Sequence, residues 1–467
     1  MGKLKQAGLL SAGLLGGILI SLQFSVMAEK EARTSLPIEE LRTLAEVFNA
    51  IKIGYVEPIE DKTLINNAIS GMLSNLDPHS TYLDVDAYKD LQVSTQGEFG
   101  GLGIEVAMED GLVKVVSPIE DTPADRAGVK TGDLIFKLDD TLVKGMTLSD
   151  AVKHMRGKPK TQIKLSILRK GEGKTIELTL TREVIKVQSV KSKLVEAGYG
   201  YLRITSFQEN TGASVVKHLN ELYKPGPLKG LVLDLRNDPG GLLNAAVGVS
   251  AAFLPQKTLV VSTDGRTPDA KHKFFASPED YVRSSKDDYI KNLPLEALKV
   301  PMIVLINGGS ASASEIVAGA LQDHKRAIIL GTTSFGKGSV QTVIPLPGGA
   351  AIKMTTSRYF TPSGNSIQAK GIAPDILVEE NANGTSTARL HEADLEKHLD
   401  NPTDKDASAP AKGASKAPAA KPKNNPGKDE SEDPSEPPSR ELASKKDYQL
   451  NQALNLLKGL QIMQSKQ

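Results

Sequence analysis

The chain has 467 residues, a formal net charge of +1 and a hydrophobic fraction of 39%. This length allows two or three domains with sizeable cores, and the near-neutral charge gives no indication of a nucleic-acid partner. There are no cysteines, which excludes disulfides, thiolate metal sites and a cysteine nucleophile. The His-Glu-x-x-His pattern of zinc peptidases does not occur, and we expect neither a metal nor an organic cofactor.

Residues 1–28 have the pattern of an export signal. Lys3 and Lys5 precede an apolar run over Ala7–Leu22, and Val26-Met27-Ala28 supplies the small residues typical of a signal-peptidase site. The apolar run of about 16 residues is shorter than the ~20 that span a bilayer, although a retained membrane anchor is the alternative. We therefore expect a cleaved signal peptide and a location in the periplasm or cell envelope.

Two different patterns follow the signal. Apolar side chains recur at helical spacing within residues 36–95, as at Leu41 and Leu44, which predicts an N-terminal helical segment. Residues 97–185 alternate short strand-like runs with turns and one helix over Ser149–Met155. This second pattern predicts a compact β-rich module.

Residues 186–380 alternate strands and helices. The apolar strands Gly230–Leu235 and Pro301–Ile306 are each followed by a glycine turn and a helix, over Leu242–Phe253 and about Ala313–Asp323. Strands that alternate with helices predict an α/β core.

The C-terminal part of the chain has a different composition. Pro, Ala, Lys and acidic residues dominate residues 381–440, which predicts a disordered linker. Residues 441–467 regain a helical stripe that includes Leu450, Leu454 and Leu457. Helical segments at both ends favour self-association, so we expect a homo-oligomer.

Ser312 is the candidate nucleophile. It lies between a predicted strand and a predicted helix, in the run Asn307-Gly308-Gly309-Ser310-Ala311-Ser312-Ala313-Ser314-Glu315. Unpaired N–H groups at a helix start favour a developing negative charge, as acyl transfer requires. The alternative is that Ser310, Ser312 and Ser314 only cap the helix.

Lys337 is the candidate base for this serine. It lies in the run Ser334-Phe335-Gly336-Lys337-Gly338-Ser339-Val340-Gln341. An exposed lysine has a pKa of ~10.4, but burial lowers it, and the amide oxygen of Gln341 is placed to accept a hydrogen bond from the amine. The alternatives are a solvent-facing lysine on a tight turn, or a histidine base. The nearest histidine in the sequence, His324, is interpreted as a solvated turn residue.

These runs, together with Phe99-Gly100-Gly101-Leu102-Gly103-Ile104 and Asp234-Leu235-Arg236-Asn237-Asp238-Pro239-Gly240-Gly241, resemble the carboxyl-terminal processing proteases (tail-specific proteases, peptidase family S41) over roughly residues 36–380. The resemblance implies an α/β core of the ClpP/crotonase type with an inserted PDZ domain and helical N- and C-terminal segments. It implies Ser312 as nucleophile, Lys337 as general base and Gln341 as the residue that positions the lysine.

The oxyanion donors are expected to be the backbone N–H groups of Ala313 and of either Gly240 or Gly241. One residue beside them departs from the family pattern, because many members have asparagine before Pro-Gly-Gly and this chain has Asp238. If that side chain shapes the oxyanion loop, its extra negative charge is unfavourable.

The loop Gly101-Leu102-Gly103-Ile104 resembles the carboxylate-binding loop of a PDZ domain. Successive backbone N–H groups form a site for a terminal carboxylate, and an extended peptide would pair with the strand Ile104–Met108. An apolar pocket beside the loop would accept an apolar final residue. Alone, the loop is compatible with an ordinary glycine-rich turn, but the segments Ser117–Ala124 and Ala127–Asp133 also resemble PDZ sequence.

Together these features predict an exported serine endopeptidase that holds the free, apolar C-terminus of a protein or peptide in its PDZ domain and cleaves with a Ser-Lys(-Gln) centre. The alternative is a catalytically silent PDZ-containing scaffold or adaptor. A serine–histidine–aspartate protease is excluded because no Gly-Asn-Ser-Gly-Gly run exists. The family suggests cell-envelope proteins as substrates, with a possible adaptor protein that delivers them.

Overall fold

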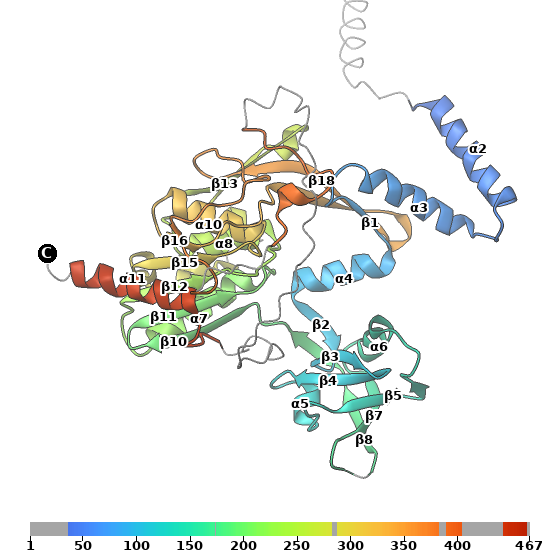
Figure 1. Cartoon of the computed structure of the whole chain (residues 1–467), viewed down its shortest axis with the longest axis horizontal. Coiled ribbons are helices and arrows are strands. Elements are labelled where there is room, and N and C mark those ends of the chain that lie inside the picture. Colours follow the sequence, from blue (N-terminus) through green and yellow to red (C-terminus); the bar gives the residue numbers. More distant parts are fainter. Residues whose placement is uncertain (1–35, 173, 283–286, 383–388, 404–441, 465–467) are drawn as a thin grey trace, which may run out of the picture. The chain divides into compact units, whose positions relative to one another are not determined.

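The computed structural model describes residues 36–172, 174–282, 287–382, 389–403 and 442–464. The predicted signal peptide at 1–28 and most of the predicted linker at 381–440 lie outside these ranges. Within them, no helix combines the length and the apolar character that a membrane span needs. Figure 1 labels most of the helices and strands.

A six-stranded sheet forms the centre of the α/β region, in the order β10-β11-β12-β15-β16-β19 (Figure 1). β10 is antiparallel to β11, and the other neighbours are parallel. Every residue of β12 and β15 is buried, which explains their continuous apolar runs. The strands are β10 (Val190–Glu196), β11 (Tyr199–Ile204), β12 (Gly230–Asp234), β15 (Met302–Ile306), β16 (Ile328–Gly331) and β19 (Ile376–Leu377).

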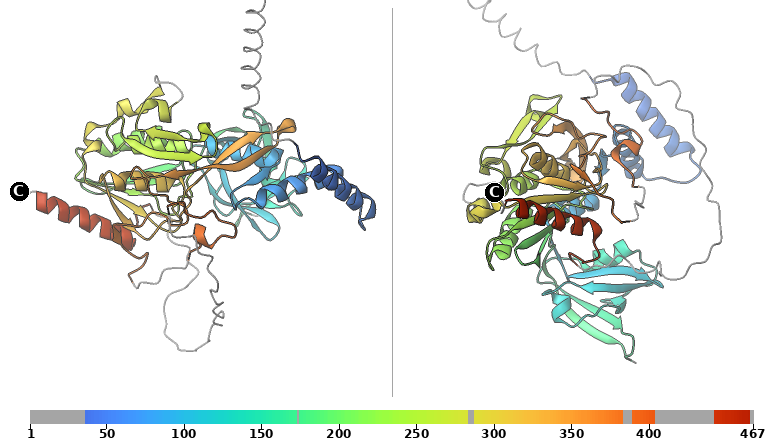
Figure 2. Two further views of the ribbon diagram at one scale, coloured as in Figure 1. Left: turned by 90° about the horizontal axis from the view of Figure 1, so that it is seen from above. Right: turned by 60° about the vertical axis from the view of Figure 1, so that its left-hand side comes forward.

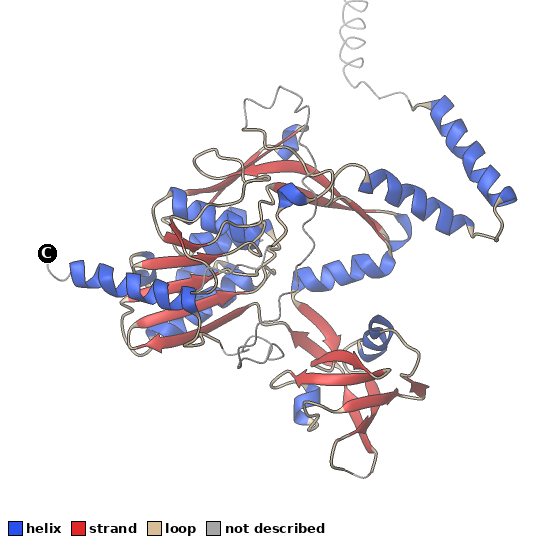
Figure 3. Ribbon diagram, viewed as in Figure 1, coloured by secondary structure: helices blue, strands red, loops and turns tan. Residues whose placement is uncertain are grey.

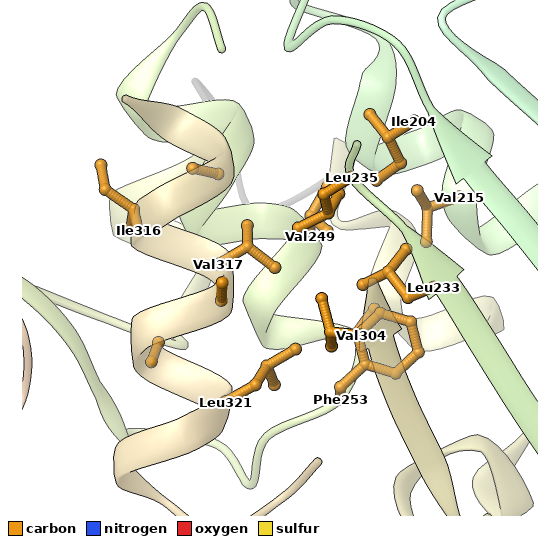
Figure 4. Close-up of a cluster of buried hydrophobic side chains, with 14 of the residues drawn as sticks. Ile204, Val215, Leu233, Leu235, Val249, Phe253, Val304, Ile316, Val317 and Leu321 are labelled. Carbon is orange, nitrogen blue, oxygen red and sulfur yellow. The ribbon is translucent and has the colours of Figure 1, made fainter. Parts of the chain in front are cut away.

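Helices cover both faces of this sheet. One face packs on α7 (Thr211–Tyr223), α8 (Leu243–Ala251) and α10 (Ala313–Asp323), and Figure 4 shows part of that cluster, where Val317 and Leu321 of α10 lie beside Val304. The other face packs on α11 (Tyr448–Gln464), drawn in red in Figure 2. The C-terminal helix is therefore part of the core.

A second sheet of five strands carries the lysine run. Its order is β1-β18-β13-β14, and β17 also pairs with β18. The strands are β1 (Thr81–Leu83), β13 (Leu259–Gly265), β14 (His272–Phe275), β17 (Ser339–Pro345) and β18 (Ala351–Phe360), with the short helix α9 (Pro278–Tyr281) after β14. Short 3₁₀ turns lie at Pro268–Ala270, Tyr289–Asn292, Leu295–Leu298, Pro347–Gly349 and Glu392–Asp394.

The β-rich module has a sheet of its own in the order β3-β4-β5-β7-β8, with β6 paired to β5 (Figure 3). The chain enters on β2 (Glu98–Gly101) and leaves on β9 (Glu183–Lys186), which pair with each other. The remaining elements are β3 (Ile104–Glu109), β4 (Leu112–Pro118), α5 (Pro123–Arg126), β5 (Leu134–Leu138), β6 (Thr141–Leu142), α6 (Leu148–Met155), β7 (Gln162–Leu168) and β8 (Ile176–Thr181). β3 lies at the edge of its sheet.

Helices precede this module. α2 (Ile38–Gly54) and most of α3 (Asp61–Ser74) belong to a separate compact unit that ends at Ile69. No residue of α2 is buried, so its apolar stripe is exposed. α4 (Val85–Gln96) starts where the Asp84 side chain accepts the N–H of Ala87 at 2.8 Å, and it ends at Gly97.

Candidate active site

Ser312 lies on a strained turn between β15 and α10. Its φ and ψ are 55° and −111°, a conformation that costs a non-glycine residue about 1–3 kcal/mol. Such strain persists only where the surrounding structure enforces it, and it is frequent at functional sites. The Ser312 side chain remains partly accessible.

The two neighbouring serines of the run have structural roles. Ser310 is buried, and its hydroxyl donates to the carbonyl of Leu235 at 2.8 Å. Ser314 is also buried, and its hydroxyl donates to the carbonyl of Asp238 at 3.0 Å. These bonds hold the turn before α10 against the loop after β12, and they leave Ser312 as the accessible hydroxyl of the three.

Glu315 joins the serine turn to the lysine turn. One carboxylate oxygen accepts the N–H of Ser312 at 2.7 Å and the N–H of Lys337 at 3.0 Å. The other accepts the Ser334 hydroxyl at 2.6 Å and the N–H of Gly336 at 2.7 Å. Burial raises the pKa of Glu315 to about 7, against these four donors, which favour the ionised form. The sequence reasoning assigned Glu315 no role, although a Glu three residues after a Ser at a helix start is the capping-box spacing.

Lys337 is partly buried in the turn that precedes β17. Burial lowers the pKa of its amine, and the positive charge of Lys353 on β18 acts in the same direction. The acidic groups Glu392, Glu315 and Asp77 oppose this shift. A lysine with a lowered pKa is a better base at neutral pH than an exposed one.

A segment after the α/β core reaches the lysine turn. The backbone N–H of Glu392 donates to the carbonyl of Phe335 at 2.9 Å. The buried Glu392 carboxylate contacts Nε2 of His79 at 2.8 Å and accepts from the Gln368 amide at 3.0 Å. Burial raises the pKa of Glu392, but these two partners hold it below its usual value. The sequence reasoning missed both His79 and Glu392.

Gln341 does not make the expected contact. Its amide nitrogen donates to the Ser339 hydroxyl at 3.0 Å and to the Thr355 hydroxyl at 3.2 Å. Among the described contacts, no hydrogen bond joins its amide oxygen to the Lys337 amine. β17 has a register shift between Val340 and Gln341, which changes the direction of the side chain relative to a regular strand.

Tyr359 lies between the two candidate catalytic residues. Its hydroxyl donates to the backbone carbonyl of Lys337. Burial raises the pKa of Tyr359 well above its usual value, and the Ser312 side chain lies close enough to oppose that rise. This tyrosine, on β18, was not identified from the sequence.

The glycine loop after β12 reaches the nucleophile turn. A Cβ atom on Gly240 would lie 2.8 Å from the backbone nitrogen of Ala313 and 2.9 Å from Cβ of Ser312, so only glycine fits there. The N–H of Gly240 donates to the Asp238 carboxylate at 2.8 Å. In the described chain, no acceptor engages the N–H groups of Gly241 and Ala313.

In the β-rich module, the loop over Gly101–Ile104 joins β2 to the edge strand β3. The carbonyls of Leu102 and Gly103 accept backbone N–H groups at 3.0 and 2.8 Å. Gly103 has a φ of 77° and lies against Thr122. An edge strand that follows a glycine loop is the arrangement that adds a peptide strand in PDZ domains.

No cluster of three or more His, Asp or Glu side chains suited to a metal ion occurs in the described ranges.

Comparison with known proteins relates this geometry to a family. The profile of Peptidase family S41 matches residues 198–378, that of the PDZ domain residues 100–180, and that of the activating protease CtpB N-terminal domain residues 20–87. A carboxy-terminal-processing protease of Bartonella bacilliformis is 47% identical over 371 residues, which cover 78% of this chain and 82% of that protein. The chain belongs to the carboxy-terminal processing proteases of peptidase family S41. The expected family, the α/β core, the PDZ domain and the helical segments at both ends are thus confirmed.

Two further relatives are each similar to this chain over most of its length. A probable CtpA-like serine protease of Staphylococcus aureus is 33% identical over 374 residues, which cover 78% of this chain and 71% of that protein. Among solved structures, the photosystem II D1 C-terminal processing protease is 31% identical, with 72% of this chain and 86% of that chain covered and a TM-score of 0.41.

Proposed function

We propose that this protease is an exported serine endopeptidase in which Ser312 is the nucleophile and Lys337 its base. The observation that carries the proposal is the Glu315 carboxylate, one oxygen of which accepts the backbone N–H groups of both residues. The accessible, strained Ser312 and the lowered pKa of the Lys337 amine support the same roles. The Staphylococcus aureus relative is named a probable CtpA-like serine protease, which is consistent with this mechanism.

In the proposed reaction, Oγ of Ser312 forms a bond to a substrate carbonyl carbon while its proton passes to Nζ of Lys337. The C–N bond then breaks as Nζ returns the proton to the leaving amine. Water then attacks the carbonyl carbon of the resulting ester, the bond from that carbon to Oγ breaks, and the proton of the water passes through Nζ to Oγ of Ser312. Tyr359 holds the carbonyl of Lys337, which restricts the lysine turn during these transfers.

The N–H groups of Gly241 and Ala313 are the proposed oxyanion donors. Both are without an acceptor in the described chain, whereas the N–H of Gly240 already donates to Asp238. Donors that are in place before the reaction stabilise the oxyanion without reorganisation. Gln341 is assigned a supporting role through Ser339 and Thr355.

For the PDZ domain, we propose that Gly101, Leu102, Gly103 and Ile104 bind the terminal carboxylate of a protein or peptide whose last residue is apolar. The edge position of β3 supports the addition of a peptide strand.

The proposed export rests on the basic start and the apolar run of residues 1–28. Self-association is supported by the exposed apolar side chains of α2, which include Leu41, Leu44 and Ile51, and an adaptor protein remains part of the proposal.

The test compares wild-type protein with Ser312→Ala on a reporter protein that ends in an apolar tail. We expect the cleavage rate to fall by at least about 1,000-fold, while the tail binds as before. Ser94→Ala, at an exposed serine of α4, is the control and should cleave at the wild-type rate. Equal cleavage by Ser312→Ala and wild type would overturn the mechanism, and binding without cleavage by either protein would identify a PDZ scaffold.

A further inference from the structure

Asp238 is the residue of the oxyanion loop that departs from the family pattern, and it is completely buried, with a relative exposure of 0%. Aspartate side chains are almost never fully buried unless they are paired. Its complete burial therefore needs a physical explanation.

The backbone of Asp238 is tied to both sides of the nucleophile. Its carbonyl accepts the N–H of Ala311 and the hydroxyl of Ser314, each at 3.0 Å. Ala311 and Ser314 flank Ser312 and Ala313 in sequence. The position of Asp238 thus fixes the loop that carries Gly240 and Gly241 relative to the nucleophile turn.

The side chain of Asp238 adds a second support. Its Oδ1 accepts the N–H of Gly240 at 2.8 Å. This bond orients the Gly240 peptide and leaves the N–H of the next residue, Gly241, without an acceptor. A carboxylic acid or an amide also accepts such a bond through its carbonyl oxygen, although less strongly than a carboxylate does.

Oδ2 of Asp238 has no hydrogen-bond partner among the described residues, and it is buried. An ionised carboxylate with an unpaired oxygen is strongly disfavoured in such a place. Two cations lie nearby, but Arg203 donates to Asp234 and to the carbonyl of Arg236, and Arg236 itself donates to Asp234. Neither guanidinium donates to Asp238.

The charged groups that act on Asp238 come from two strands. Burial raises the pKa of Asp238 to about 7, and the Asp234 carboxylate at the end of β12 adds to the rise. The Gly240 N–H, the Ser314 hydroxyl and the Arg203 charge on β11 oppose it. Both protonation states are therefore populated near neutral pH.

We propose that Asp238 is a positioning residue of the oxyanion loop that acts in its protonated form, and that loss of its proton lowers turnover. This inference rests on the proposed serine mechanism. The neutral acid holds the Gly240 peptide without placing a negative charge beside the donors. The ionised form keeps the contact but repels the negative charge that develops on the substrate oxygen.

The sign of the pH effect follows from these roles. Below the pKa of Asp238 the acid is neutral and the oxyanion donors act at full strength. Above it the carboxylate forms and its repulsion grows. Activity therefore rises as Lys337 loses its proton and falls as Asp238 loses its own. These opposite effects narrow the pH range over which the wild-type protein is active.

The first experiment measures kcat and KM of the full chain from pH 5.5 to 8.5 for wild type, Asp238→Asn and Asp238→Ala. Asparagine keeps the acceptor and removes the charge. The ratio of kcat for Asp238→Asn to wild type should be near 1 at pH 5.5 and rise to about 10 at pH 8, because we expect the ionised form to be nearly inactive and about nine-tenths of a group with a pKa of 7 is ionised there. A ratio that stays constant with pH overturns the charge effect.

Asp238→Ala removes the acceptor and tests the positioning role. Its kcat should be about 10- to 100-fold below that of Asp238→Asn at every pH, with KM changed by less than about threefold. Asp140→Asn, at an exposed aspartate, is the control and should match wild type. Full activity of Asp238→Ala contradicts the positioning role.

A second measurement does not depend on cleavage. Carbon-13 NMR of the aspartate carboxyl groups in Ser312→Ala should give one signal that titrates near pH 7 and is missing in Ser312→Ala/Asp238→Asn. Titration of every aspartate below about pH 5 overturns the inference whatever the mechanism. Cleavage by Ser312→Ala at the wild-type rate would instead overturn the proposed function, so the two failures are distinguishable.

Discussion

The loop that precedes β3 in the PDZ domain and the loop that follows β12 in the protease core are both proposed to present backbone N–H groups to a negatively charged oxygen. They are supported differently. The PDZ loop is held by backbone bonds to the carbonyls of Leu102 and Gly103, at 3.0 and 2.8 Å, and by the Thr122 hydroxyl at 3.2 Å. Its supports are neutral groups.

The loop after β12 is supported by buried acids. Asp238 holds the N–H of Gly240 at 2.8 Å. Asp234 is fully buried and accepts from Arg236 of this loop at 2.6 Å. The neighbouring nucleophile turn likewise depends on the buried Glu315.

The difference follows from the two anions. A terminal carboxylate is charged before it binds, so a loop of neutral groups is sufficient. An oxyanion exists only during the reaction, and its donors must already be in place, which favours support by buried side chains that hydrogen-bond the loop directly. Changes to the PDZ loop should therefore alter the affinity for tails, whereas changes around the oxyanion loop should alter turnover and its pH dependence.

The largest effect on this comparison is expected from Lys337→Met, which keeps the apolar stem and removes the base. We expect kcat to fall by at least about 1,000-fold, while the Kd of an apolar tail peptide, measured by fluorescence anisotropy, stays within twofold. A comparable loss of tail affinity would contradict the separation of the two sites.

The same lysine gives a pH test in Asp238→Asn, which lacks the proton loss that we propose lowers wild-type turnover. Cleavage by this variant should increase as pH rises through the pKa of Lys337, which burial and the charge of Lys353 lower from the usual 10.5. Lys353→Met removes the second cause, so the rising limb should move to higher pH. An unmoved limb would show that Lys353 does not act on the titrating group.

The next effect concerns Glu315→Gln. An amide group would place an NH₂ donor against two of the four donors that the carboxylate accepts. Repulsion there should separate the serine and lysine turns, lower kcat by about 100-fold and reduce the free energy of unfolding by about 1–3 kcal/mol. Thermal melting and initial rates check both parts, and unchanged kcat with a lowered Tm would make Glu315 structural only.

Much of the fold could be predicted because its signals are local. The helix expected at about Ala313–Asp323 is α10, and the helix expected at Ser149–Met155 starts one residue earlier in the structure. The strands that carry the glycine loops are apolar except for Asp234 at the end of β12, as is typical of buried parallel strands. Ser312 and Lys337 were identified from runs in which turn, helix start and chemistry coincide.

The remaining parts of the site depend on contacts between distant segments. His79 and Glu392 are 313 positions apart, and no periodicity connects them. The direction of the Gln341 side chain depends on a β-bulge that the sequence does not signal. The burial that raises the pKa of Asp238 likewise comes from packing between loops rather than from its neighbours in sequence.

A smaller effect, on binding alone, is expected from Gly103→Ala. The added methyl group would lie 2.3 Å from Cβ of Thr122 at a φ of 77°, so the PDZ loop must shift. The Kd of an apolar tail peptide should rise by about tenfold, equivalent to about 1.4 kcal/mol, while cleavage of an unfolded substrate without an apolar tail stays unchanged. Gly111→Ala is the matched control, because it has the same φ of 77° and nothing within 4 Å. Equal loss of affinity in both variants would attribute the effect to backbone strain rather than to the loop.

The smallest effect is expected from Asp447→Asn, at the start of the C-terminal helix. The Asp447 carboxylate accepts two hydrogen bonds from Arg236, at 2.6 and 3.0 Å, so the residue that precedes α11 supports the oxyanion loop. The oxygen of an amide accepts only one of these bonds, so the Arg236 side chain is held less firmly. The activation free energy should therefore rise by about 1 kcal/mol, which lowers kcat by about fivefold, with KM and tail affinity unchanged. Lys458→Met is the matched control, because it removes the 2.8 Å ion pair with Glu196 from the same helix and leaves Arg236 untouched. If both variants lower Tm by the same amount but only Asp447→Asn lowers kcat, the helix acts on the loop through Arg236; equal kcat in the two variants would limit α11 to covering the sheet.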